Sequence, residues 1–309
     1  MNKLVKVLLS LAAVLVFFLA IWLIGRMINP SLNLDQTALL RFVFVGIGLL
    51  IVFAVYYVTR ESKIWEVGTR QVVYMAIGAA LYAIFSFLFN GTVFVVPSVS
   101  QVALRPAIAI PMFFGYAFGP VVGFFTGAVG NMFGDALTGF GLSPQWSIGN
   151  GLVGMIAGMV WLFTDKKKSL NMVLIIATAL VAIVTALYFL NPNTANGTYF
   201  DNATGNFGQT PLTVFAGISL LIGLVLIVVV RFVFGKNIDI AAAVTWALLG
   251  NVLGIGFAAV SDIWINGYPP VVALVGEFIP SAGPNLIFAA ILVPILVVAY
   301  ASIQRQTGR

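Results

Sequence analysis

Apolar runs of about twenty residues, separated by short polar connections, recur along the whole chain. Runs of this kind are typical of helices that cross a lipid bilayer, because backbone amides in lipid must find their hydrogen bonds within their own segment. The alternation of apolar and polar residues that a membrane β-barrel requires does not occur in these runs. We predict ten spans, at residues 4–28, 39–59, 71–89, 103–118, 120–138, 147–163, 170–190, 211–234, 240–260 and 281–302.

The expected fold class is therefore all-α, a polytopic membrane helix bundle. Composition agrees, because 61% of the 309 residues are hydrophobic and only 8% are charged, whereas soluble domains carry about 25% charged residues. The first run is too long for the core of a cleaved signal peptide, so we expect it to be retained as a span. A charged stretch at 60–70 predicts a boundary between a two-helix hairpin with its linker, at 1–66, and a main membrane domain at 67–309.

Basic residues are distributed unevenly between the two ends of the predicted spans. If the N-terminus lies inside, twelve of the 15 Lys and Arg residues lie on the inner side, and only Arg26, Arg41 and Arg105 lie outside. Lys and Arg accumulate on the cytoplasmic side of membrane proteins. We therefore expect a protein of the cytoplasmic membrane, in contact with lipid, with both termini in the cytoplasm. The net charge of +6 follows this topology and forms no basic patch with interleaved aromatic residues, so it does not predict nucleic-acid binding.

Polar and aromatic side chains gather at the outer ends of several predicted spans. Asn131 and Asp135 lie four residues apart, and so do Trp146 and Asn150, so each pair shares a helix face. Because polar groups are costly in lipid, we expect them to face one another or a wet cavity, which is typical of a small-molecule site. The predicted substrate-binding residues are Arg105, Asn131, Asp135, Trp146, Asn150, Asp262, Glu277 and Asn285. Two alternatives remain open: the residues are interfacial anchors and helix caps, or Arg105 and Asp135 simply pair with each other.

Small residues recur at helical spacing in the third, fifth and sixth predicted spans. The third span carries a stripe that includes Ala76, Ala80 and Ala83. The other two carry the pairs Gly123/Gly127, Gly130/Gly134 and Gly154/Gly158. Such spacing lets helices approach closely. It predicts either packing within the chain or a groove that docks another membrane subunit.

Several kinds of chemistry are excluded or disfavoured by the residues present. The chain has no Cys and no His, so we predict no metal site, no thiolate chemistry and no His catalysis. Gly134 and Asp135 match part of the motif of aspartyl intramembrane proteases, but Met132 stands where that motif has Gly. A proton-coupled carrier would need a carboxylate near the middle of the membrane, and the predicted spans have none there. An intramembrane enzyme and a non-transport membrane scaffold remain as alternatives.

One segment has a pattern that belongs to a known family. The run LRPAIAIPMFFGYAFGPVVGFFTGAVGNMFGDALTGFG at 104–141, followed by WSIGNGLVGMIAG at 146–158, resembles the substrate-binding S component of energy-coupling factor (ECF) transporters. The third predicted span resembles the first helix of that six-helix module, and residues 250–302 resemble its last two helices. The resemblance implies a subunit that captures a vitamin or related micronutrient from outside. It also implies partners: a membrane-embedded coupling (T) subunit and two cytosolic ATPase subunits.

The resemblance assigns further roles by position. Ala76, Ala80 and Ala83 would dock the coupling subunit, and the loop at 90–102 would cover the ligand. Any ATP would be used by the partners, because Gly235-Lys236 is followed by Asn237 rather than by the Ser or Thr of a phosphate loop, so we expect no cofactor in this chain. The family slightly favours a riboflavin-like ligand over thiamine, a pterin or a modified base. Four spans are extra, namely the hairpin and the pair at about 170–234; alternatively that pair belongs to the module and the C-terminal pair is additional.

Overall fold

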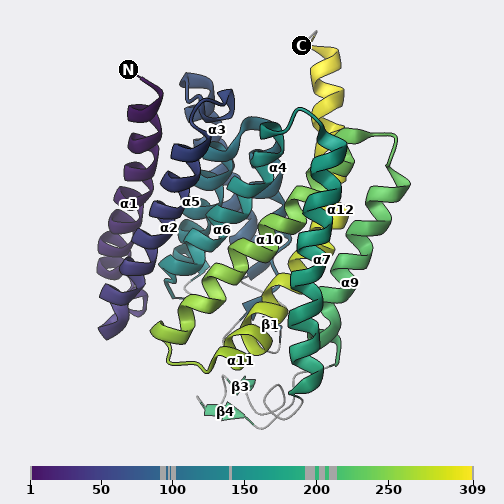
Figure 1. Ribbon diagram of the computed structural model, residues 1–309. Coiled ribbons are helices and arrows are strands. Elements are labelled where there is room, and N and C mark those ends of the chain that lie inside the picture. The colour runs from purple at the N-terminus through teal and green to yellow at the C-terminus, as the bar shows by residue number, and fades with distance from the viewer. Residues whose placement is uncertain are drawn as a thin grey trace.

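The computed structural model is a bundle of helices that run up and down, with two short β-hairpins at one end (Figure 1). It describes residues 2–90, 95–96, 98, 102–138, 141–191, 199–201, 206–208 and 214–307. The main helices in these ranges are α1 (Lys3–Ile28), α2 (Ala38–Thr59), α3 (Thr69–Asn90), α4 (Ala109–Phe118), α5 (Pro120–Thr138), α6 (Pro144–Gly158), α7 (Lys166–Leu190), α9 (Val214–Val233), α10 (Ile238–Ile265) and α12 (Ile279–Gln306). The hairpins pair β1 (Val95–Val96) with β2 (Val102–Ala103), and β3 (Tyr199–Asp201) with β4 (Asn206–Gly208), both antiparallel.

Each predicted span corresponds to one of these helices, so the prediction of an all-α bundle is confirmed. Short 3₁₀ turns lie at Pro30–Leu32, Asp35–Thr37, Lys63–Trp65, Pro106–Ile108 and Met159–Leu162. Seven helices of the described chain are long and apolar enough to cross a membrane, when Pro270–Gln306 is taken as one. This makes the chain a multi-pass membrane protein. The helices α4, α5 and α6 are not among the seven, and α4 has only 10 residues.

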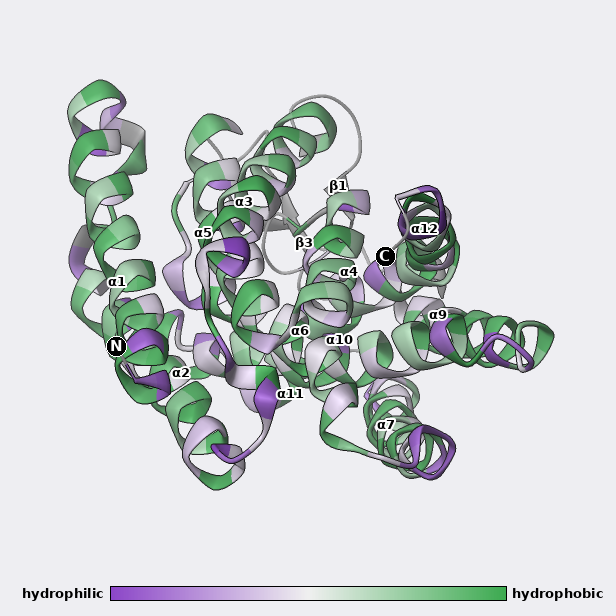
Figure 2. Cartoon of the chain, turned by 90° about the horizontal axis from the view of Figure 1, so that it is seen from above, coloured by the Kyte–Doolittle hydropathy of each residue, from purple (hydrophilic) through white to green (hydrophobic). Residues whose placement is uncertain are grey.

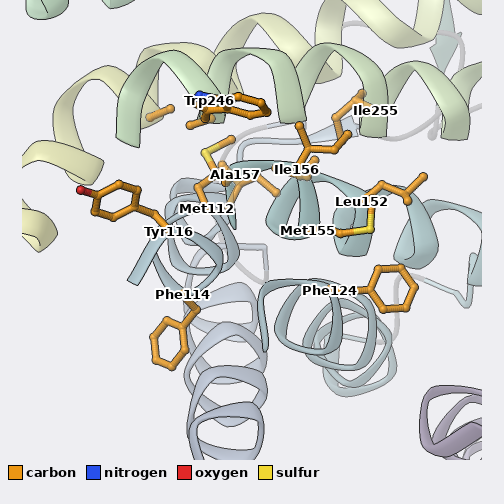
Figure 3. Close-up of a cluster of buried hydrophobic side chains, with 14 of the residues drawn as sticks. Met112, Phe114, Tyr116, Phe124, Leu152, Met155, Ile156, Ala157, Trp246 and Ile255 are labelled. Atoms are coloured by element: carbon orange, nitrogen blue, oxygen red, sulfur yellow. The ribbon is translucent and has the colours of Figure 1, made fainter. Parts of the chain in front are cut away.

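The shorter helices lie inside the bundle, because most residues of α4, α5 and α6 are buried. Seen from above, α6 and α10 lie centrally, while α1, α7 and α9 lie at the periphery (Figure 2). Side chains of α4, α6 and α10, among them Met112, Ile156 and Trp246, pack in one buried cluster (Figure 3). In the most apolar stretch of α10, 83% of the residues are buried, whereas in that of α2 only 17% are buried. A helix covered in this way need not match the thickness of the bilayer, because protein rather than lipid surrounds it.

The glycine pairs serve packing within the chain. A Cβ on Gly123 of α5 would overlap the backbone carbonyl of Gly154 in α6, and a Cβ on Gly127 would overlap that of Asn150. On another face of α5, a Cβ on Gly134 would lie 2.7 Å from the Cβ of Ser86 in α3. The absence of side chains at these positions therefore brings α5 into close contact with both neighbours.

The C-terminal helix begins earlier than the predicted start at residue 281. A short α-helical segment, α11 (Pro270–Val272), leads into a π-helical turn at Ala273–Phe278 and then into α12. Wider turns of this kind interrupt the regular α-helical hydrogen bonds and occur frequently at functional sites. Glu277 lies in this turn and is fully buried.

Both termini lie at the same end of the bundle (Figure 1). The opposite end, here called the distal end, holds both β-hairpins and the C-terminal ends of α3, α5 and α10. Ten helices that alternate in direction return the chain to the side on which it began, as the sequence predicts. That the termini face the cytoplasm stays a prediction from the distribution of Lys and Arg.

Candidate functional site

An ion pair between Arg105 and Asp135 lies at the distal end. Nη2 of Arg105 is 2.7 Å from Oδ1 of Asp135, and the two side chains are 20% and 5% exposed. Arg105 precedes the turn that leads into α4, whereas Asp135 lies in the last turn of α5. The pairing expected from their opposite charges is thus present. Burying such a pair carries a large desolvation cost, so its presence in an apolar bundle points to a role beyond packing.

Asn131 connects this ion pair to the neighbouring helices. Its Nδ2 donates to Oδ2 of Asp135 and to Oγ of Ser147, both at 2.9 Å. Its Oδ1 accepts hydrogen bonds from Arg105 and, at 3.3 Å, from Nδ2 of Asn150. The hydroxyl of Tyr82, from α3, lies 3.4 Å from Oδ1 of Asn131 and 3.1 Å from Oδ1 of Asn150. Polar side chains of α3, α5 and α6 therefore satisfy one another inside the bundle.

A second part of the same network centres on Asp262 at the end of α10. Its carboxylate accepts from the indole Nε1 of Trp146 at 2.7 Å and from Nε2 of Gln145 at 3.1 Å. Asn150 joins the two parts, because its Nδ2 also donates to the backbone carbonyl of Trp146 at 2.9 Å. Asp262 is 1% exposed. We refer to Tyr82, Arg105, Asn131, Asp135, Gln145, Trp146, Ser147, Asn150 and Asp262 as the distal network.

The start of α6 explains why so many of these residues come from one segment. Pro144 at the first helical position fixes the start of the helix. The next two turns then present Gln145, Trp146, Ser147 and Asn150. Gly127 of α5 lets the backbone at Asn150 approach closely, so that short amide side chains can reach across from one helix to the other.

Six of the eight predicted binding residues belong to the distal network. They are Arg105, Asn131, Asp135, Trp146, Asn150 and Asp262. The other two lie on the C-terminal helical segment. Asn285 donates to Oδ1 of Asn251 at 3.2 Å, and Asn251 donates to the carbonyl of Ala282 at 2.9 Å. These bonds join α12 to α10.

Glu277 lies near the network through Tyr268. Tyr268 lies in the connection between α10 and α11, and its pKa is raised first by burial and then by the negative charges of Glu277 and Asp262. Both carboxylates therefore act on the same phenol. The two carboxylates come from different helical segments, Asp262 from α10 and Glu277 from the π-helical turn.

Three residues that bond predicted site residues or their neighbours at the distal end were missed from the sequence. Tyr82 lies within an apolar span, where its hydroxyl gives no signal that separates it from the other aromatic residues. Ser147 is flanked by predicted site residues but is a common helix residue. Arg41 resembles an interfacial anchor in the sequence, yet its guanidinium Nη1 is 3.2 Å from Oε1 of Gln145.

An apolar groove lies on another face, between α1, α3 and α5. Its volume is about 960 Å³, and the predicted docking residues Ala76, Ala80 and Ala83 line it. Ala76 and Ala80 are exposed, whereas Ala83 is buried at 6% exposure against α5. Phe17 of α1 forms part of the opposite wall. The stripe of small residues on α3 therefore has an accessible part and a part that contacts α5.

The loop at 90–102, expected to cover a ligand, falls mostly outside the described residues. Strands β1 and β2 and Ser98 are its described parts. The amide of Val102 donates to Oγ of Ser98 at 3.3 Å. The covering role stays a prediction.

A family model described as the S component of an ECF-type riboflavin transporter matches residues 66–231. The chain belongs to this S-component family. The match confirms the resemblance carried by residues 104–158, and it places the chain among transporter components rather than among enzymes. It begins at the end of the N-terminal hairpin and extends through α3, α4, α5, α6, α7 and most of α9.

Relatives of this S component cover a shorter stretch. A UPF0397 protein of Vibrio atlanticus is 38% identical over 98 residues, which are 32% of this chain and 52% of the relative. A UPF0397 protein of Aliivibrio salmonicida is 36% identical over 102 residues, 33% of this chain and 54% of the relative. The chain thus spans about half the length of the curated relatives it matches. No solved structure matches it.

Proposed function

We propose that this S component is the substrate-capturing subunit of an ATP-driven uptake transporter for a vitamin-class micronutrient, and that it binds its ligand from outside at the distal end. One observation carries the proposal: polar side chains from α3, α5, α6 and α10 form a continuous buried network at that end. Polar groups buried in a membrane protein are costly and typically mark substrate pathways. A bundle held together by packing alone would have apolar residues at these positions.

Exposure divides the network into residues that can touch a ligand and residues that hold them. Arg105 and Trp146 are partly exposed, whereas Asn131 and Asp135 are 0% and 3% exposed. The guanidinium offers donors, and the indole offers a flat apolar face. These groups suit a planar heterocycle that carries carbonyl or ring-nitrogen acceptors. Because the family is described by riboflavin transport, riboflavin is the first ligand to test, ahead of thiamine and pterins.

The energy for uptake would come from partners. We propose a membrane-embedded coupling subunit that docks at the apolar groove, together with two cytosolic ATPase subunits. Ala76 and Ala80 support this site, because small exposed side chains let a partner helix approach the backbone of α3 closely. The orientation of the chain in the cytoplasmic membrane, with the termini inside, is part of the same proposal and is supported by the bias of Lys and Arg.

The last two helices of the six-helix module are proposed to be α10 and α12. Asp262 of α10 belongs to the distal network, and α10 packs directly against α6. By contrast, α7 and α9 lie at the periphery (Figure 2), although the family match runs through both. In this assignment, α1, α2, α7 and α9 are the four additional spans.

A panel of water-soluble vitamins tests the proposal directly. Purified protein is heated with each vitamin in the absence of ATP, and unfolding is followed by intrinsic fluorescence. A ligand that binds only the folded state raises the unfolding temperature, and at 100 times its Kd it stabilises by about 2.7 kcal/mol. We expect riboflavin or another planar vitamin to raise this temperature, with a Kd below about 1 µM. A flat response across the whole panel would contradict a capture role.

A further inference from the structure

The N-terminal hairpin is connected to the distal network by a side chain of its own. Arg41 lies in the first turn of α2 and is partly buried. Its Nε donates to Oγ1 of Thr37 at 2.8 Å, which orients the guanidinium. Its Nη1 then lies 3.2 Å from Oε1 of Gln145 and 3.5 Å from Oγ of Ser143. Both of these residues lie at the start of α6, on the other side of the predicted domain boundary.

Gln145 is fixed from two sides by this arrangement. Its Oε1 accepts from Arg41, and its Nε2 donates to Oδ1 of Asp262 at 3.1 Å. A guanidinium can only donate, and a carboxylate can only accept. Only one orientation of the amide therefore satisfies both partners, and Gln145 is 1% exposed, so water is a poor substitute for either. Arg41 and Asp262 thus hold Gln145 together in the one orientation in which its NH₂ group faces Asp262.

Asp262 in turn holds the indole of Trp146 at 2.7 Å. We propose that Arg41 is a positioning residue of the substrate site, so that the N-terminal hairpin is part of the binding unit rather than a separate module. The chain of contacts runs from Arg41 through Gln145 and Asp262 to Trp146, whose partly exposed ring is available to a ligand. An effect of Arg41 on ligand affinity rests on the proposed function, whereas its effect on the position of the Trp146 indole does not.

Close packing keeps α2 at the distance that this contact needs. A Cβ on Gly48 would overlap the side chain of Ile148 in α6, and it would lie 3.5 Å from the ring of Phe257 in α10. Gly46, two residues earlier, has nothing within 4 Å of such a Cβ. The two glycines therefore form a matched pair: a larger side chain at Gly48 pushes α2 away from α6, and one at Gly46 enters open space.

The first experiment needs no ligand. Protein labelled with ¹⁵N-tryptophan gives an indole N–H resonance for Trp146, assigned by its loss in Trp146→Phe. We expect Arg41→Met to shift this resonance, and Arg41→Lys to restore it in large part, because Lys still donates to Gln145. Arg26→Met is the control, since Arg26 belongs to the same hairpin but is exposed and stacks on Trp22. Gly48→Leu should reproduce the Arg41→Met shift, and Gly46→Leu should not. If Arg41→Met does not fold, the contact is tested by comparing the Trp146 resonance in Arg41→Lys with that in Gly48→Leu.

The second experiment measures affinity for riboflavin by quenching of its fluorescence, and KM and Vmax for its uptake. We expect Arg41→Met to raise Kd and KM about tenfold with Vmax unchanged, a change that corresponds to about 1.4 kcal/mol. Arg26→Met should leave both constants as in the wild type. A Trp146 resonance that is unchanged in Arg41→Met would overturn the positioning role. A wild-type protein that binds no vitamin, with the resonance shift still present, would instead contradict the proposed function alone.

Discussion

The distal network and the apolar groove are built on the same two helices but on different faces of them. Helix α3 contributes Tyr82 to the network and Ala80 to the groove, and α5 contributes Asn131 and Phe125 respectively. In the network, polar side chains satisfy one another, and most of them are buried. In the groove, small and apolar side chains leave a surface of α3 uncovered by the chain itself. The proposed capture and docking roles can therefore be altered separately, although one helix pair would carry both.

The largest expected effect comes from filling the groove. Ala80→Trp places a large ring where a partner helix would contact α3, so we expect vitamin uptake to fall to background. Ligand affinity should stay within about twofold of the wild type, a difference of about 0.4 kcal/mol, because Ala80 lies outside the network. Uptake of labelled vitamin into cells that express the whole transporter measures the first quantity, and titration of purified protein measures the second.

Ile77→Trp is the matched control for this change. Ile77 is exposed at 46% on the same helix but does not line the groove. The Ile77→Trp variant should therefore take up the vitamin as the wild type does. Equal loss of uptake in both variants would show that any bulky residue on α3 interferes, and the groove would lose its special role.

Removal of Asp135 should give the next largest effect. Asp135→Ala leaves Arg105 without its ion-pair partner at 2.7 Å, so only the hydrogen bond to Asn131 still holds the guanidinium. We expect Kd to rise about 100-fold, which corresponds to about 2.7 kcal/mol, together with a lower unfolding temperature.

A double variant separates stability from binding. Because replacing both members of a buried ion pair by apolar residues is often neutral or stabilising, Arg105→Met with Asp135→Leu should recover the unfolding temperature. It should not recover ligand affinity. A double variant that regained both would reduce the ion pair to a structural element.

A smaller effect is expected at the other part of the network. Asp262→Asn keeps the size of the side chain but replaces one acceptor oxygen by an NH₂ group, so either Gln145 or Trp146 loses its bond. We expect about a tenfold rise in Kd, or about 1.4 kcal/mol, with Vmax of uptake unchanged. The same affinity in Asp262→Asn as in the wild type would confine the binding site to the Arg105 side.

The smallest effect on affinity is expected at Asn285. Asn285 donates a hydrogen bond to Asn251, and this bond joins α12 to α10. Asn285→Leu removes a buried hydrogen bond and should destabilise the protein by about 1–2 kcal/mol, while Kd changes less than about twofold, or about 0.4 kcal/mol. A large loss of affinity without loss of stability would instead support the role in binding predicted from the sequence.

Much of the distal network was accessible from the sequence, because its strongest signals are local. Asn131 with Asp135, and Trp146 with Asn150, lie four residues apart, so the helix period alone places each pair on one face. The contacts of Tyr82 and Arg41 are different. Tyr82 meets Asn150 across 68 positions of the chain, and Arg41 meets Gln145 across 104. No spacing rule connects residues so far apart, because the packing of whole helices brings them together.

The sequence by itself determined that the chain forms membrane helices, where most of them lie along the chain, and which helices carry polar side chains near one end. These follow from hydropathy and from the need to satisfy backbone amides in lipid. Only the tertiary structure decided which polar groups meet, that the glycines of α5 bring their neighbours close, and that the N-terminal hairpin contacts the network. The physical reason is that a hydrogen bond between side chains requires a donor–acceptor distance that is correct to within a few tenths of an ångström. Close packing between helices sets this distance, and the order of residues within one helix does not.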